Sequence, residues 1–402
     1  MTQRPRCILA FSGGLDTSLC VVYLREELGY DVITATVDTG GFDAAELRAI
    51  ETRSRELGAL EHITIDGTQE LFDGWIRHII AANYLKGGVY PLCVGVERVV
   101  QAAHMVQIAR DRGASAIVHG STGAGNDQVR FDVVIRTLAP DLKIIAPIRD
   151  LGWGRAEEAD YLAKHGFEVD ASTKRYSINA GLWGTTIGGG ETKTSDGIVP
   201  DHVYPATKSV NDAPAEHVDV TIRFEKGIPV ALNGEALAPI PLLRKLDALA
   251  AAHGVGRGIH LGDTIIGIKG RIAFEAPAAL VMINAHLELE KLVLTRWQQF
   301  VKDQVAEFYG MFLHEGQYLD PALRDIEALL DSSQALVTGE VTTRLHRGTH
   351  QVVATRSPHS LLDATRAAYG EESGLWDGRD AEGFAKIRSI QTMLAWRAAG
   401  KS

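Results

Sequence analysis

The chain has 402 residues, 45% hydrophobic and 23% charged, a composition typical of a globular protein long enough for two domains and a tail. Its net charge of −10 argues against a basic nucleic-acid interface, and no apolar run is long enough to cross a membrane, so we expect neither partner. Three cysteines without paired spacing exclude a zinc site and predict a reducing, cytoplasmic location.

The first 168 residues alternate short apolar runs with amphipathic stretches. We expect buried strands at 7–11, 31–37, 61–66, 116–119 and 143–146, and helices at 19–28, 42–57, 69–84 and 95–112. This alternation predicts a doubly wound parallel sheet covered by helices on both faces. Ligands of such sheets bind beyond the carboxyl ends of the strands, which places residues 11–18, 37–41 and 120–127 along one rim.

After residue 168 the pattern becomes α+β. Residues 184–200 are rich in Gly, Thr and Ser and are expected to form a mobile loop. Hairpins are expected at 218–232 and 339–356, and helices at 242–253, 278–314 and 380–398. The chain therefore divides into a nucleotide-binding domain (1–168), an α+β domain (169–365) and a C-terminal helical tail (366–402). The apolar stripe of the last helix is expected to pack either on its own domain or on a neighbouring subunit.

The strand-to-helix turn Ser12-Gly13-Gly14-Leu15-Asp16-Thr17-Ser18 is the most informative motif. Its two glycines let several backbone N–H groups point at one spot, its hydroxyls add donors, and the helix N-terminus adds positive potential. These features predict a cradle for a phosphate-type anion. The turn lacks the lysine of the common P-loop motif. It resembles the pyrophosphate-binding loop of ATP pyrophosphatases, which cleave ATP between the α and β phosphates. The alternative is a glycine-rich turn in an ordinary α/β domain.

A second polar loop, His119-Gly120-Ser121-Thr122-Gly123-Ala124-Gly125-Asn126-Asp127, follows the fourth expected strand at the same rim, and Arg130 comes three residues later. Its glycines allow close backbone approach to a ligand, and its side chains supply a hydroxyl, an amide, an acid and a guanidinium. The alternative is a polar loop in which Asn126 or Asp127 only caps the following helix.

With both loops in hand, the chain resembles the argininosuccinate synthase family nearly end to end. The resemblance includes Tyr176-Ser177-Ile178, Leu182-Trp183-Gly184, Ala231-Leu232-Asn233-Gly234, His253-Gly254-Val255-Gly256-Arg257, Gly267-Ile268-Lys269, Phe274-Glu275-Ala276-Pro277 and Ser357-Pro358. It implies that ATP, accompanied by Mg²⁺, adenylates the ureido oxygen of citrulline, and that the amine of aspartate then displaces AMP. It also implies a homotetramer whose C-terminal helix reaches across subunits.

The resemblance also implies roles for individual residues. It assigns ATP binding to Ala10, Phe11, Ser12, Gly13, Gly14, Leu15, Asp16, Thr17, Ser18, Val37 and Gly120. It assigns aspartate binding to Thr122, Asn126 and Asp127, and a citrulline-like acceptor to Tyr90, Asn126, Arg130, Ser177 and Thr186. Asp16, Asn126 and Arg130 are the implied catalytic residues.

The chain departs from the family pattern mainly near the acceptor. Ala124 stands where the family usually has Lys, and Val94 and Gly95 stand where it has Thr and Ser. Gly262 and Phe274 replace a Glu and a Tyr, so both, with Gly95, are candidate acceptor positions that lack the usual polar side chain. Either a neighbour such as Asp263 replaces the missing acid, or the acceptor differs from citrulline at its distal end.

Three alternative functions remain at this stage. The first is an aspartate ligase of specialised metabolism with a non-citrulline acceptor. The second is a non-catalytic nucleotide-binding paralogue. The third, a tRNA-modifying ATP pyrophosphatase, is disfavoured by the acidic charge and by the absence of a basic or zinc module.

Overall fold

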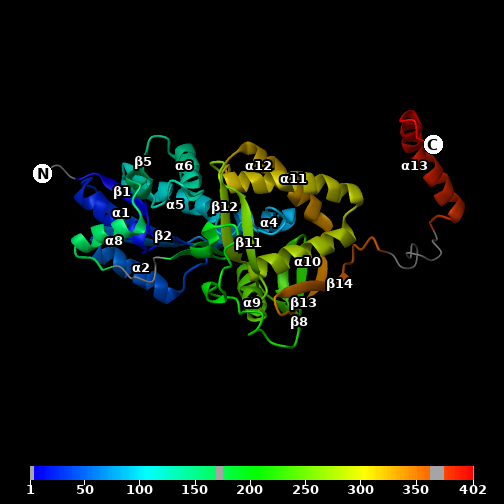
Figure 1. Cartoon of the computed structure of the whole chain (residues 1–402), viewed down its shortest axis with the longest axis horizontal. Coiled ribbons are helices and arrows are strands. Elements are labelled where there is room, and N and C mark those ends of the chain that lie inside the picture. Colours follow the sequence, from blue (N-terminus) through cyan, green and yellow to red (C-terminus); the bar gives the residue numbers. More distant parts are fainter. Residues whose placement is uncertain (1–3, 169–174, 363–374, 402) are drawn as a thin grey trace.

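The computed structural model describes residues 4–168, 175–362 and 375–401. Its first half contains a five-stranded parallel sheet, as expected from the sequence (Figure 1). The strand order is β3 (Glu61–Asp66), β2 (Asp31–Asp38), β1 (Arg6–Ala10), β4 (Ala116–Val118) and β5 (Lys143–Ile145). Each strand lies within about a residue of its expected range. The three central strands β1, β2 and β4 are mostly buried apolar runs, whereas the edge strands β3 and β5 are only partly buried.

Helices cover both faces of this sheet. They are α1 (Leu15–Glu26), α2 (Ala44–Glu56), α5 (Glu97–Arg112), α6 (Asp127–Leu138), α7 (Pro147–Leu151) and α8 (Arg155–Lys164). Alternate residues of β1 face opposite cores: Cys7 and Leu9 pack in the cluster that contains Leu19 of α1, and Ile8 packs in the cluster that contains Val100 of α5. All three β1 side chains are fully buried, which explains why this strand reads as a continuous apolar run.

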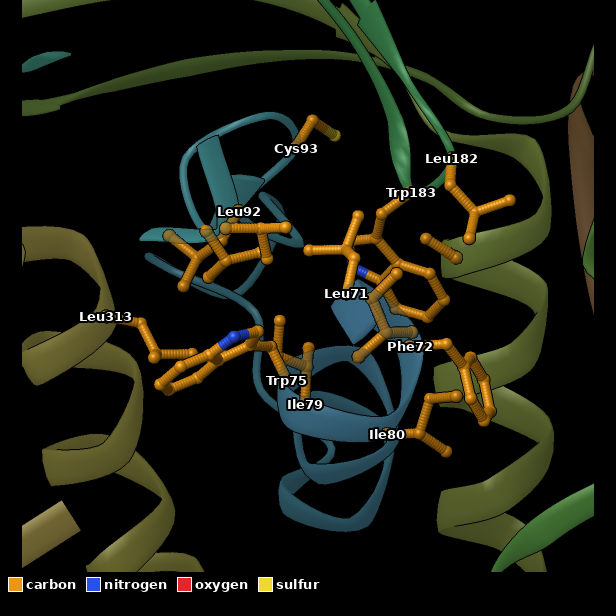
Figure 2. Packing of buried hydrophobic residues seen from close by; sticks show 14 of the residues in the cluster. Leu71, Phe72, Trp75, Ile79, Ile80, Leu92, Cys93, Leu182, Trp183 and Leu313 are labelled. Atoms are coloured by element: carbon orange, nitrogen blue, oxygen red, sulfur yellow. The ribbon is translucent and has the colours of Figure 1, made fainter. Parts of the chain in front are cut away.

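The helix expected at 69–84 is interrupted by one wide turn. It consists of α3 (Thr68–Leu71), the π-helical turn η1 (Phe72–Ile76) and α4 (Arg77–Ala82), and it ends at Asn83 in the left-handed conformation. Figure 2 shows Trp183 and Leu313 approaching this segment from opposite sides in that view. Both residues belong to the second half of the chain, so the segment is buried among later elements, and this tertiary packing fixes the wide turn.

The second half contains two antiparallel sheets. The larger has the order β10 (Glu235–Ala236), β9 (Ile228–Leu232), β8 (Val218–Glu225), β13 (Gly339–His346) and β14 (Thr349–Arg356). Both expected hairpins are confirmed, with tight turns at Lys226-Gly227 and Arg347-Gly348 whose residues have positive φ. The expected helices are also present as α9 (Pro239–Ala252), α10 (Pro277–Val293) and α11 (Arg296–Glu315), and α12 (Pro321–Ser333) follows them.

The smaller sheet shows that the prediction of a mobile loop at 184–200 is wrong in part. β6 (Tyr176–Gly181) and β7 (Gly184–Gly189) form a hairpin, and β7 pairs with β12 (Lys269–Glu275), which pairs with β11 (Arg257–Asp263). A short 3₁₀ helix, η3 (Gly190–Lys193), follows. Glycine weakens local strand signals, so this sheet is specified by long-range pairing that no local pattern reveals.

The expected terminal helix is α13 (Gly378–Ala398), and it stands apart from the rest of the chain in Figure 1. None of its residues is buried. The two expected domain boundaries, near residues 169 and 366, lie outside the described residues. No helix in the described ranges is long and apolar enough to cross a membrane.

Candidate functional site

The first loop has the geometry of an anion cradle. Gly13 has a φ of +75°, and a Cβ at that position would lie 3.2 Å from Ile50 Cγ1, so the turn requires glycine. The hydroxyls of Ser12 and Thr17 face each other at 3.3 Å over the start of α1. Among the described residues, no side chain caps this helix, so its first N–H groups stay available to a ligand.

Other residues that the resemblance assigns to ATP binding lie under the same rim. Phe11, Leu15 and Val37 are at most 9% exposed, and their side chains belong to the two cores. The Phe11 backbone accepts a hydrogen bond from Thr36 Oγ1 at 2.7 Å. These residues thus present mainly backbone atoms at the rim, and their assignment to ATP stays a prediction.

The two sequence loops meet directly. A Cβ at Gly120 would lie 3.1 Å from Thr17 Cγ2 and 3.6 Å from the Thr17 nitrogen. His119 holds the second loop in place: its Nδ1 accepts from the Ser121 N–H at 3.3 Å, and its Nε2 donates to Asp132 Oδ1 at 3.0 Å. The buried imidazole therefore positions Gly120 against the start of α1.

A carboxyl that sequence reasoning missed lies beside Asp16. Glu158 of α8 is 2% exposed, and its Oε2 has no hydrogen-bond partner among the described residues. Burial, together with the Asp16 carboxylate, raises the pKa of Glu158 to about 8. The sequence offers one signal for the burial of Glu158: it lies four residues before Leu162, a buried residue on the same face of the helix.

The aspartate candidates lie at the start of α6. Asn126 Oδ1 accepts from the backbone N–H of Ile265 at 2.8 Å, which ties this loop to the β11–β12 turn and leaves the amide N–H groups for a ligand. Asp127 accepts from Arg98 Nε and from Arg130 Nη1, both at 2.9 Å. Although burial favours the neutral acid, these two arginines lower the pKa of Asp127. Thr122 is exposed nearby.

Arg130 joins this loop to the second half of the chain. Its side chain is 7% exposed, and its Nε and Nη2 donate to the His314 carbonyl oxygen at 3.1 and 2.9 Å. That carbonyl belongs to the last turn of α11, so the guanidinium also satisfies a helix C-terminus. A Cβ at Gly95 would lie 3.4 Å from the guanidinium atoms, so Gly95 leaves one face of Arg130 without a covering side chain.

The acceptor candidates share one face of the smaller sheet, because residues directly paired across strands point the same way. Thr186 pairs with Phe274 and Asn179, Phe274 pairs with Gly258, Ser177 pairs with Gly188, and Gly262 pairs with Gly270. Tyr90 packs on this face, 5.2 Å from the Phe274 ring centroid. The structure therefore brings Tyr90, Ser177, Thr186, Gly262 and Phe274 together, although they come from the 90–95 segment and from four different strands.

The backbone segment 90–95 beside this face is strained and tightly held. Leu92 and Val94 have φ values of +61° and +52°, which is unfavourable for non-glycine residues and most of all for β-branched valine. Three aromatic side chains donate hydrogen bonds to its backbone carbonyls: Tyr90 to Cys93 O at 2.7 Å, Trp183 to Pro91 O at 2.9 Å and Tyr318 to Gly95 O at 2.7 Å. Such over-determined strain is typical of functional sites.

Behind this segment lies Glu97, a second buried acid that sequence reasoning missed. It is 1% exposed, its Oε2 accepts from Thr39 Oγ1 at 2.7 Å, and its Oε1 has no partner among the described residues. A Cβ at Gly181 would lie only 1.7 Å from Oε1, so the β6–β7 turn covers the carboxyl. Burial is the main cause that raises the pKa of Glu97 to about 7.

Glu97 should therefore make stability fall as pH rises. Between the ordinary pKa of about 4.5 and the folded value of about 7, the folded chain holds the proton that the unfolded chain has released. In this window the unfolding free energy of the wild type should fall by up to about 1.4 kcal/mol per pH unit because of Glu97, and we expect Glu97→Gln to lack this dependence. Urea denaturation from pH 5 to 8 measures it, with exposed Glu216→Gln as control. Parallel curves for Glu97→Gln and the wild type would contradict the assignment.

Together, the parallel sheet, the uncapped start of α1 and the adjoining polar loop define a nucleotide-binding α/β enzyme of the ATP-pyrophosphatase type. Family models extend this class to the whole chain: the arginosuccinate synthase N-terminal HUP domain matches residues 6–168, and the C-terminal domain matches residues 176–395. The chain belongs to the argininosuccinate synthase family. It is accordingly an ATP-dependent C–N ligase of the kind that forms AMP and pyrophosphate.

Curated relatives match nearly the full length. The argininosuccinate synthase of Methanocaldococcus jannaschii is 41% identical over 387 residues, covering 96% of this chain and 97% of its own. Those of Xanthomonas campestris pv. campestris and Pyrococcus furiosus are 43% and 39% identical, covering 96% and 97% of this chain and 97% and 94% of their own. All three relatives are argininosuccinate synthases, so they give no support to the alternatives of another acceptor or of a non-catalytic role.

Proposed function

We propose that this chain joins aspartate to citrulline. The ureido oxygen of citrulline attacks the α-phosphorus of ATP, the bond to the bridging oxygen breaks, and pyrophosphate leaves. The aspartate amine then attacks the activated ureido carbon, AMP leaves, and the amine loses a proton, which gives argininosuccinate. The observation that carries this proposal is the direct contact of the Gly120 loop with Thr17, because it supports binding ATP and aspartate side by side.

The chain's own residues have distinct tasks in this scheme. The loop at 12–18 and the start of α1 hold the phosphates, and Asp16 is the acidic residue of this loop. Thr122 and the Asn126 amide N–H groups bind aspartate carboxylates, and Asp127 accepts from its ammonium with the lone pairs that Arg98 and Arg130 leave. Asn126 and Arg130 meet the acceptor near its reacting carbonyl, where their N–H groups stabilise the negative charge on the α-phosphate oxygens and on the departing AMP.

Mg²⁺ is proposed to accompany ATP, and the structure fits it in one respect. Glu158 has a buried carboxyl oxygen beside Asp16 that has no partner among the described residues, and a divalent cation held there would favour the ionised form of both acids, because carboxylate oxygens suit a hard cation. These two residues would hold the ion, which supplies positive charge against the phosphates. Ala124 provides no cation of its own in the second loop.

The test is product analysis with purified protein, ATP, Mg²⁺, aspartate and citrulline. Equal amounts of AMP, pyrophosphate and argininosuccinate are expected, each dependent on both amino acids. Release of ADP, or AMP release that does not require aspartate, would contradict the proposal. Product from another ureido compound but none from citrulline would favour an acceptor altered at its distal end, which the missing polar side chains at Gly95, Gly262 and Phe274 motivate.

We further propose a cytoplasmic homotetramer assembled through α13. Its side chains Phe384, Ile387, Ile390, Met393 and Leu394 are 41–72% exposed and recur at helical spacing. All three cysteines are free and buried, which fits a reducing compartment.

Disrupting the apolar stripe of α13 should change the assembly. Ile387→Glu is expected to shift the mass measured by light scattering from four chains toward smaller species, because it places a charge in a contact that buries apolar surface. Ser389→Glu, two residues away and outside the stripe, serves as the matched control. A single-chain mass for the wild type, or an unchanged mass for Ile387→Glu, would count against assembly through this helix.

A further inference from the structure

The acceptor-facing side of the smaller sheet contains no carboxylate. The register places Ser177, Asn179, Thr186 and His260 on this face, and its other positions are glycine, isoleucine or phenylalanine. Glu275 points the opposite way, where it accepts from Thr207 Oγ1 at 2.7 Å. The sheet therefore offers hydroxyls, an amide and an imidazole, but no acid that could pair with an ammonium group.

His260 takes the space that a side chain at position 262 would need. A Cβ at Gly262 would lie 2.6 Å from His260 Nε2, so the imidazole replaces an ordinary side chain there. The ring stacks on Tyr90 with centroids 5.3 Å apart and planes at 18°, and it borders Gly87, where a Cβ would lie 3.4 Å from its Cε1. Neither ring nitrogen has a hydrogen-bond partner within the described ranges. The imidazole is thus oriented by packing and left open to a ligand.

Lys86 belongs to the same backbone segment as Tyr90, on which this ring stacks. Its backbone pairs with Tyr90, N–H to O, at 2.7 Å in one direction and 3.1 Å in the other. Its ammonium makes no ion pair within 4.0 Å with any described carboxylate. Burial lowers the pKa values of Lys86 and His260, and the positive charge of Lys86 contributes to the shift of His260. Glu315, Asp263 and Glu307 act on Lys86 from farther away, and Asp263 is already bound to Lys269 at 2.6 Å.

We propose that His260 and Lys86 bind the carboxylate of the acceptor's amino-acid end, and that its ammonium group is not recognised. This assignment rests on the proposed function, and it specifies which group of the acceptor molecule the acceptor site recognises. An imidazole N–H and an ammonium both donate to a carboxylate, whereas the sheet face has no carboxylate for an ammonium and offers no side-chain acceptor at Gly262 or Phe274.

The test compares citrulline with two analogues in the AMP-forming assay. One is 5-ureidopentanoate, which lacks the ammonium, and the other is 4-ureidobutylamine, which lacks the carboxylate. We expect KM for the first within about threefold of citrulline. We expect kcat/KM for the second to fall at least tenfold, and by up to about 100-fold, which is the effect of one or two lost charge-assisted hydrogen bonds.

Variants then locate the interaction. His260→Ala and Lys86→Gln should each raise KM for citrulline about tenfold or more, with kcat and KM for ATP and aspartate within threefold. His260→Gln and Lys86→Arg, which keep a donor, should recover part of the loss. Leu261→Ala, on the same strand but the opposite face, is the matched control. In His260→Ala, the discrimination between citrulline and 4-ureidobutylamine should shrink.

Two results would overturn the assignment alone. One is 4-ureidobutylamine turned over as well as citrulline, and the other is unchanged discrimination in His260→Ala. A tenfold penalty for 5-ureidopentanoate would show that another group reads the ammonium and would likewise refute it. If the wild type forms no AMP with any acceptor, the proposed function fails, and this assignment fails with it.

Discussion

Gly120→Val is expected to reduce kcat/KM for ATP at least 100-fold while leaving the fold intact. The Cβ alone would lie 3.1 Å from Thr17 Cγ2, tighter than ordinary contact, and valine adds two methyl groups beyond it. Neither side can yield freely, because His119 and Val118 anchor the loop in the core and Thr17 belongs to the first turn of α1. A displacement of about 1 Å between reacting groups can cost about 100-fold in rate.

The effect should be local and graded. Gly120→Ala is expected to give a smaller loss, and Gly74→Ala, where a Cβ meets no atom within 4 Å, should give none. Steady-state kinetics with varied ATP measures the loss, and circular dichroism checks that the variants fold. Full activity in Gly120→Val would mean that the two loops do not need to touch, and the shared binding of ATP and aspartate would have to be abandoned.

Local sequence patterns predicted the parallel sheet because its signals are short-range. β1 is a continuous apolar run followed at once by two glycines, and each later strand is bounded by a helix of clear period. The hairpin at Lys226-Gly227 was equally legible from its alternation and turn residues. In these cases the residues that form an element are sufficient to predict it.

The smaller sheet could not be predicted in the same way. β7 reads Gly-Thr-Thr-Ile-Gly-Gly, and its glycines serve packing: a Cβ at Gly189 would lie 2.5 Å from the Arg175 carbonyl oxygen. Likewise, a Cβ at Gly258 would lie 2.2 Å from the Phe274 ring. These glycines are required by partners far along the chain, so their role appears only when the partners are in place.

The same argument applies to the candidate site. Ser177, Thr186 and Phe274 were predicted as acceptor residues from the family resemblance alone, and the sheet register explains why they lie on one face. His260 was missed because nothing near it in the sequence indicates that its ring occupies the space left by the absent side chain of Gly262. Glu97 and Glu158 were missed because a glutamate on a helix usually faces solvent, and only tertiary contacts bury these two.

Arg130→Ala is expected to abolish measurable turnover and to lower the unfolding free energy by about 2–3 kcal/mol. Its removal leaves the His314 carbonyl and one Asp127 oxygen without their donors, and an unsatisfied buried group costs about 1–3 kcal/mol. Arg98 still binds Asp127, which limits the loss. Arg136→Ala is the matched control, because Arg136 lies on the same helix, is 69% exposed and should contribute less than about 1 kcal/mol.

Two measurements separate the structural role of Arg130 from its action on substrate. Arg130→Lys keeps the charge but loses the fork that reaches both His314 and Asp127, so it should recover part of the stability and little of the activity. Added guanidinium ion should restore some turnover to Arg130→Ala if the cation acts at the acceptor carbonyl. A variant that keeps more than about a tenth of wild-type kcat below its melting temperature would show that Arg130 only joins α6 to α11. Arg130 shares the task of joining the ATP-binding half to the half that carries the acceptor face with other contacts, among them the hydrogen bond from Ile265 to Asn126. Losing Arg130 should therefore disturb the alignment of the two halves at the site even where each half stays folded.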